Sequence, residues 1–137
     1  MGRILAIDYG TKRTGLAATD PLQIISSPLT AIPTHELIDY LKRYFEKEDV
    51  DTVVVGWPTK DDGSPTNNTK NVEAFVNRFR KVFPSMDIVL HDEWNTSNMA
   101  MSSMIAGGMK KKDRRNKLNV DKLSAAIILQ NYMESKA

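Results

Sequence analysis

The 137 residues amount to one ordinary domain, and a composition of 41% hydrophobic and 26% charged residues is that of a globular protein. The absence of cysteine excludes disulfides, zinc–cysteine sites, iron–sulfur clusters and a cysteine nucleophile. A net charge of +2 excludes a polycation, and no apolar stretch has the length of a signal peptide core or a membrane span. We therefore expect a single cytoplasmic domain over residues 1–137.

The beginning of the chain predicts three strands in succession. Residues 3–8 are an apolar run that ends at Asp8, residues 14–19 follow a tight turn that contains glycine, and a third strand covers about 24–32, interrupted by Pro28. Short links between successive strands are typical of antiparallel pairing. The sequence therefore predicts a three-stranded meander.

Helices and strands then alternate. We expect a helix that Thr34 can cap, a helix that stops before Pro84, a helix over 96–106 and a last helix that Asn119 can cap. Two buried strands are expected over 52–55, ending at Gly56, and over 87–91. The apolar faces of the first, second and last helix are Leu37, Ile38, Leu41, Tyr44 and Phe45; Val72, Phe75, Val76 and Phe79; and Leu123, Ala126, Ile127 and Met133. This order predicts an α/β fold, a five-stranded mixed sheet flanked by helices on both faces.

Acidic residues follow the predicted parallel strands. Asp8 ends the first strand, Asp92 and Glu93 end the fifth, and Asp121 lies in the first turn of the last helix. Active sites of open α/β sheets gather at the carboxyl ends of parallel strands, and carboxylates suit Mg²⁺ or Mn²⁺. Two such ions can stabilise an in-line phosphoryl displacement. Adjacent strand residues point to opposite faces, so one of Asp92 and Glu93 at most is a primary ligand. Each acid also has a structural explanation, because Asp is common in turns and in first helical turns.

Positive charge is concentrated near the end of the chain. A cluster of this kind can neutralise phosphates, although a solvated loop explains it equally well. The cluster consists of Lys110, Lys111, Lys112, Arg114, Arg115 and Lys117. Trp57 and Trp94 could stack on bases or pack in the core.

Four segments resemble the motifs of one protein family. Residues 8–17 read DYGTKRTGLA, against D-x-G-x-K-R-x-G-x-A, and residues 54–58 read VVGWP, which with Asp62-Gly63 match V-V-G-x-P…D-G. Residues 92–97 read DEWNTS, against D-E-R-x-T-T, and residues 120–130 read VDKLSAAIILQ, against V-D-x-x-A-A-x-x-I-L-Q. The segments keep the family's order and spacing over essentially the whole chain. The sequence therefore resembles the YqgF/RuvX family of Holliday-junction-resolvase-like proteins.

The resemblance implies an RNase H-like fold and a hydrolase, a nuclease that trims the 5′ end of the precursor of 16S ribosomal RNA during ribosome biogenesis. It also leaves open a Holliday-junction resolvase of DNA recombination and repair. Carried over residue by residue, the catalytic metal ligands are Asp8, Glu93 (or Asp92) and Asp121, and they would hold Mg²⁺ or Mn²⁺ as two ions. The implied partner is a nucleic acid, and the chain would act as a monomer or homodimer, without a membrane.

Two departures from the family lie in the segment 92–97. Trp94 replaces an Arg that could bind phosphate through a bidentate fork, and Ser97 replaces the second Thr. Trp94 could stack on a base instead. Phosphate contacts are then expected from Lys12, Arg13 and the basic residues Lys110, Lys111, Lys112, Arg114 and Arg115.

Two other hypotheses compete with the nuclease. The turn at Asp8, Gly10, Thr11 and Gly15 also resembles the phosphate-binding turn of actin-like ATPases and sugar kinases, but those proteins need two lobes and 137 residues provide one. Alternatively, the chain is a nucleic-acid-binding ribosome-assembly factor without catalysis. Cleavage that depends on a divalent metal would separate the enzyme from this factor.

Overall fold

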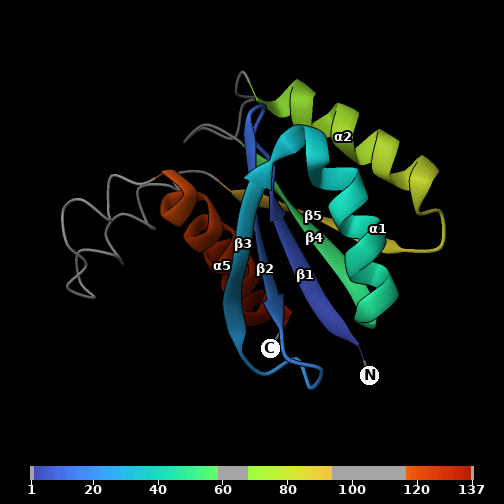
Figure 1. Ribbon diagram of the computed structural model, residues 1–137. Coiled ribbons are helices and arrows are strands. Elements are labelled where there is room, and N and C mark those ends of the chain that lie inside the picture. Colours follow the sequence, from blue (N-terminus) through green and yellow to red (C-terminus); the bar gives the residue numbers. More distant parts are fainter. Residues whose placement is uncertain (1, 59–67, 94–116, 137) are drawn as a thin grey trace.

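A single mixed sheet forms the centre of the molecule (Figure 1). The computed structural model describes residues 2–58, 68–93 and 117–136, and it describes side chains within 2–57, 68–91 and 123–135. The strands are β1 (Arg3–Asp8), β2 (Arg13–Thr19), β3 (Ser26–Pro33), β4 (Val50–Pro58) and β5 (Asp87–Glu93). They lie in the order β3-β2-β1-β4-β5; β1, β2 and β3 pair antiparallel, and β1, β4 and β5 pair parallel. The predicted five-stranded mixed sheet is confirmed.

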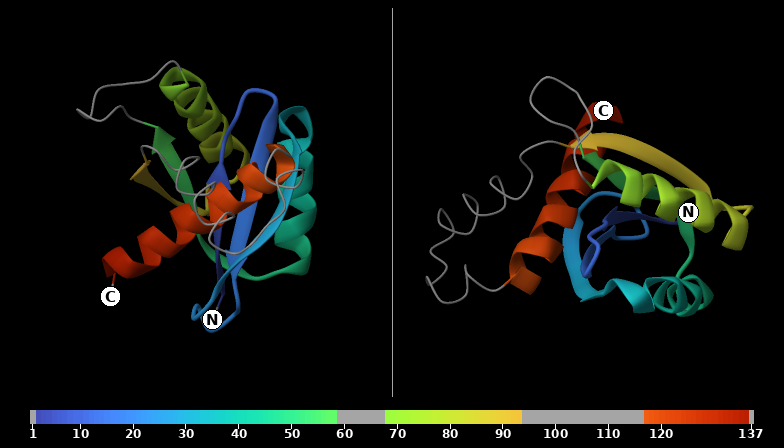
Figure 2. Two further views of the ribbon diagram at one scale, coloured as in Figure 1. Left: turned by 90° about the vertical axis from the view of Figure 1, so that its left-hand side faces the viewer. Right: turned by 90° about the horizontal axis from the view of Figure 1, so that it is seen from above.

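Helices cover both faces of this sheet (Figure 2). One face carries α1 (Leu37–Lys47), which follows the short 3₁₀ helix η1 (Thr34–Glu36), and α2 (Thr69–Val82). The other face carries α5 (Lys117–Lys136), which contacts all five strands. The helix expected over 96–106 lies outside the described residues. No helix in the described ranges is long and apolar enough to cross a membrane.

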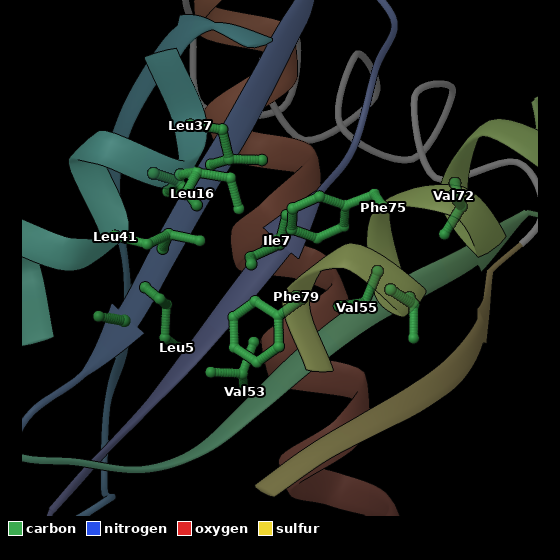
Figure 3. Packing of buried hydrophobic residues seen from close by; sticks show 13 residues of the cluster. Leu5, Ile7, Leu16, Leu37, Leu41, Val53, Val55, Val72, Phe75 and Phe79 are labelled. Carbon is green, nitrogen blue, oxygen red and sulfur yellow. The ribbon is translucent and has the colours of Figure 1, made fainter. Parts of the chain in front are cut away.

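The hydrophobic core has two layers, because side chains alternate along the central strands. In β4, Val53 and Val55 face α1 and α2, whereas Val54 faces α5. The layer beneath α1 and α2 is the larger and contains the buried Phe79 (Figure 3). The layer beneath α5 contains Ala125, which lets this helix approach the sheet closely. Burial on both faces explains why β1 and β4 are apolar runs without alternation.

The third strand begins later than predicted, at Ser26. The Asp20 carboxylate accepts hydrogen bonds from the backbone N–H groups of Ile24 and Ile25, both at 2.8 Å, and these bonds hold the link between β2 and β3 as a loop. Pro28 is accommodated because β3 is an edge strand and the register with β2 shifts between Leu16 and Ala17, beside this proline.

Both predicted helix caps are wrong. The Thr34 side chain makes no cap hydrogen bond, and α1 begins three residues after it, preceded by Glu36. The last helix begins at Lys117, so Asn119 lies inside it. Asp121 is consequently the fifth residue of α5 rather than a residue of its first turn. The first four residues of α5 read KLNV, and Asn119 resembles a cap in this pattern although the helix begins two residues before it.

Candidate active site at the carboxyl edge of the sheet

The parallel strands β1, β4 and β5 end at one edge of the sheet, which we call the carboxyl edge. Ile7 pairs with Val55, and Val55 pairs with Leu90. Asp8 lies one residue beyond that level, beside the paired positions Gly56 and His91. Asp8 is half-buried, and its neighbours along β1 are fully buried. The predicted location of Asp8, at the carboxyl end of a parallel strand, is confirmed.

Alternation along β1 determines which face of the sheet Asp8 occupies. Leu5 and Ile7 belong to the layer beneath α1 and α2, whereas Ile4 and Ala6 belong to the layer beneath α5. Position 8 therefore shares the face of Ala6, the face that α5 crosses. Tyr9 again packs on the α1 and α2 side, which agrees with the alternation.

The backbone just after Asp8 is fixed by contacts from the α1 and α2 layer. The Tyr9 ring stacks on Phe75 of α2, with the ring centroids 4.8 Å apart, and the Tyr9 carbonyl accepts a hydrogen bond of 3.0 Å from the Asn68 amide. The Thr34 hydroxyl donates to the Gly10 carbonyl at 2.6 Å and lies 2.9 Å from the Thr14 hydroxyl. These contacts hold the turn that orients Asp8.

Glycine is required in that turn. A Cβ at residue 10 would overlap the carbonyl oxygen of Arg13, which is backbone and cannot swing away. The turn can therefore close from β1 into β2 only where the side chain is absent.

At the end of β5, His91 lies on the α5 face of the sheet. Its ring meets Tyr132 of α5 edge-on, with the centroids 6.1 Å apart. Position 92 pairs with Trp57 and position 93 with Pro58, so both acids predicted here belong to β5 at the carboxyl edge. The side chains of Asp92 and Glu93 lie outside the described part of the chain.

The helix α5 packs closely over this face. Ser124 and Ala125 are fully buried. The Ser124 hydroxyl has no hydrogen-bond partner among the described residues, and such a buried orphan is rare in proteins. Figure 1 shows that α5 begins toward the end of the sheet where β1 turns into β2. Asp121 is in this part of α5, and its side chain lies outside the described part.

Comparison with known proteins identifies the family. The family model described as RuvX, Holliday junction resolvase, matches residues 2–135. The chain belongs to the RuvX family. Two relatives, in Phocaeicola vulgatus and Flavobacterium johnsoniae, are 52% and 50% identical to it over 136 residues. The alignments cover 99% of this chain and 98% and 99% of those proteins, and both carry the name "Putative pre-16S rRNA nuclease".

A solved structure shares the fold of this RuvX chain. RuvC of T. thermophilus, in complex with a Holliday junction substrate, superposes with a TM-score of 0.56 over 98% of this chain and 95% of RuvC. The sequences are 12% identical, so the likeness concerns the fold alone. It confirms the RNase H-like fold that the sequence motifs implied.

The structure describes the side chains of three predicted site residues, Asp8, Lys12 and Arg13. Lys12 is exposed and Arg13 is half-exposed, both directly after the turn at Gly10. The other predicted nucleic-acid contacts lie outside the described residues; they are Trp94, Lys110, Lys111, Lys112, Arg114 and Arg115. Among the side chains that the structure describes, no three His, Asp or Glu residues form a cluster for a metal, and Asp8 is the one predicted ligand within that set.

Sequence reasoning missed the residues that support Asp8 from a distance. Thr34 was predicted as a helix cap and Asn68 was given no role, yet both hold the turn after Asp8. Their partners lie 24 and 59 residues away in the chain, and no local pattern encodes such a contact. Trp57, read as either a base-stacking or a core residue, packs half-buried against the layer beneath α1 and α2.

Proposed function

We propose that this chain is a metal-dependent nuclease that hydrolyses phosphodiester bonds in the precursor of 16S ribosomal RNA, in the cytoplasm. The observation that carries the proposal is the position of Asp8, half-buried at the carboxyl edge and on the face that α5 crosses. Membership of the RuvX family and the name of its relatives supply the reaction class and the substrate.

The proposed metal ligands are Asp8, Glu93 and Asp121. Position 91 lies on the α5 face, because His91 contacts Tyr132 there. Residues two apart in a strand share a face, which favours Glu93 over Asp92 as the partner of Asp8. These ligands come from three elements that are far apart in the sequence.

The spacing of residues along α5 supports Asp121 as the third ligand. Asp121 precedes Ser124, Ala125 and Ile128 by three, four and seven residues, which is the spacing of positions that share one helix face. All three of those residues are buried against the sheet. The spacing therefore favours a position for Asp121 on the sheet-facing side of α5.

Three carboxylates are a donor set that fits Mg²⁺ or Mn²⁺, because both cations prefer oxygen ligands. When bound, two such ions would stabilise the attacking and the leaving oxygen of the phosphodiester during hydrolysis. The chain's own contribution is to hold Asp8 in place through the turn that Thr34 and Asn68 brace. Lys12 and Arg13, together with the basic segment 110–117, would neutralise phosphates of the substrate.

The test is cleavage of a 16S rRNA precursor with Mg²⁺ or Mn²⁺. We expect Asp8→Asn to lose at least about 100-fold in cleavage rate while the circular dichroism spectrum and unfolding midpoint are retained. Asp39→Asn, at an exposed position of α1, is the matched control and should cleave normally. Wild-type cleavage without added metal, or normal cleavage by Asp8→Asn, would refute the proposal.

The same assay locates the β5 ligand. Glu93→Gln should lose cleavage as Asp8→Asn does, whereas Asp92→Asn should retain most of it. The reverse result would assign the ligand to Asp92 and contradict the alternation argument.

A second candidate substrate is a four-way DNA junction, because the matching family model carries the description of a Holliday junction resolvase. Both substrates should be offered to the same preparation. Preferential cutting of the junction at symmetric positions would favour the resolvase, and it would require a dimer that presents two carboxyl edges.

A further inference from the structure

The exposed face of α1 combines aromatic and basic side chains. Tyr40, Arg43, Tyr44 and Lys47 follow one another at intervals of three, one and three residues, which places them on one helix face. The rings of Tyr40 and Tyr44 lie nearly parallel, with an angle of 15° and the centroids 6.1 Å apart. Both tyrosines are partly buried, since one side packs against the core layer beneath α1 and α2, and both cations are exposed. We call these four residues the α1 stripe.

The α1 stripe lines a hollow in the surface. A depression of about 250 Å³ is bounded by the four residues of the stripe and by Glu48. A second depression of about 380 Å³ adjoins it, because Tyr44 and Glu48 line both, and it extends to the β2–β3 loop at Asp20. Together they form a groove between α1 and that loop.

The charge of this groove is positive along α1. Glu48 forms an ion pair with Arg3, whose Nε lies 3.0 Å from the carboxylate, and the Asp20 carboxylate lies away from α1, in the β2–β3 loop. No carboxylate of the described residues lies within ion-pair distance of Arg43 or Lys47. Two cations beside two partly exposed aromatic rings are the elements of a single-strand binding surface, in which bases stack and phosphates are neutralised.

We propose that the α1 stripe binds a single-stranded segment of RNA, with a base stacking on Tyr40 or Tyr44 and phosphates contacting Arg43 and Lys47. This inference rests on the proposed function, since the RNA it would hold is a flanking part of the substrate cleaved at the carboxyl edge. A tyrosine hydroxyl is neutral at pH 7, and burial raises the pKa of both tyrosines further, so neither repels phosphate.

The path from this surface to the carboxyl edge runs along α1. The helix follows Thr34, which bonds the turn two residues after Asp8, and its 11 residues then lead away from that edge over about 16 Å. A strand that leaves the carboxyl edge on this side would therefore pass the stripe. The stripe would position the substrate and would not take part in the chemistry.

The test measures binding separately from cleavage, in full-length protein that carries Asp8→Asn. The probe is a fluorescein-labelled 12-nucleotide oligouridine. We expect Tyr40→Leu with Tyr44→Leu to weaken binding by about 10-fold. Arg43→Gln with Lys47→Gln should reduce the slope of log K against log salt by about 1.4, the value for two phosphate contacts on a single strand.

The matched control removes two charges from another helix. Arg78 and Lys81 are exposed on α2, where no aromatic side chain is exposed in the described residues. Arg78→Gln with Lys81→Gln should leave both affinity and salt slope unchanged. An equal loss of affinity and salt slope in this control would mean that the α1 effect comes from the overall charge of the protein, and it would overturn the proposal.

Other outcomes are equally decisive. The proposal that the α1 stripe binds RNA would be overturned if oligouridine did not bind, or if both α1 double variants bound it unchanged. A protein partner would then be the remaining occupant of the groove. Persistent cleavage by Asp8→Asn would instead overturn the proposed nuclease site, while the effect of the α1 variants on binding would still stand.

Discussion

Replacing Thr34 with valine tests whether the turn after Asp8 is braced as the structure indicates. Valine keeps the shape of threonine and removes the hydroxyl, which donates to the Gly10 carbonyl at 2.6 Å and lies 2.9 Å from the Thr14 hydroxyl. A hydrogen bond contributes about 1 kcal/mol net, so two should lower the free energy of unfolding by about 2 kcal/mol. With a urea m-value of about 2 kcal/mol/M, the midpoint should fall by about 1 M.

The same variant should also cleave more slowly. If Thr34 helps to orient Asp8, kcat should fall by about 10-fold with little change in KM, since a displacement of 1 Å at a reacting group can cost about 100-fold. Thr30→Val is the control, because Thr30 lies in β3 four residues before Thr34, is half-buried, and its hydroxyl bonds to none of the described residues. Equal destabilisation in both variants, or a loss below about 0.5 kcal/mol in Thr34→Val, would refute the reasoning.

Three further predictions concern the two core layers and the loop between β2 and β3. Phe79→Ala should lower the free energy of unfolding by about 3–5 kcal/mol in urea titration, because the ring is fully buried, and a loss below about 2 kcal/mol would contradict this. The pKa of Asp20 should lie below 3.8 in an NMR titration, because the N–H groups of Ile25 and Ile24 stabilise its carboxylate. The stabilisation is therefore present above the unfolded-state pKa and lost as the pH falls through the lower folded-state pKa; a pKa at or above 3.8 would contradict the hydrogen bonds. Ser124→Ala should leave stability unchanged or raise it by up to about 1 kcal/mol, since the buried hydroxyl is unpaired, and a loss above 1 kcal/mol would reveal a partner.

The central strands and the α1 and α2 helices were predictable because their sequence signal is local. Residues 3–8 and 52–55 are apolar without alternation, and a strand buried on both faces requires this pattern. The amphipathic period of α1 and α2 likewise predicted Leu37, Leu41 and Phe79 as core residues, and all three are fully buried.

The boundaries of other elements depended on interactions that no local pattern encodes. Ile24 and Ile25 have strand-forming side chains, yet the Asp20 carboxylate holds their backbone in a loop, and both remain largely exposed, at 65% and 63%. Thr34 precedes a helix and resembles a cap, but its hydroxyl donates to the Gly10 carbonyl, in the turn between β1 and β2. In both cases a side-chain hydrogen bond outweighed intrinsic propensity.

The candidate site was predictable in part, for a geometric reason. Asp8 was located by the rule that sites form where parallel strands end, which needs only the strand order. The preference for Glu93 over Asp92 needed the face of β5, which became known through the contact between His91 and Tyr132. Sequence alone gives the alternation of a strand but not which set of positions faces which helix.

The two core layers have different roles at the carboxyl edge. Asp8 faces α5, but its orientation depends on Thr34, Asn68 and Phe75, which belong to the opposite layer. A substitution that loosens the α1 and α2 layer should therefore slow cleavage before it unfolds the protein, because it frees the turn at Gly10 while the sheet persists. Variants of the α5 face should behave differently, since that face would form the walls of the site itself. Thr34→Val should consequently lose both stability and activity, whereas Ser124→Ala should lose no stability, so that any activity it loses would come from the site itself.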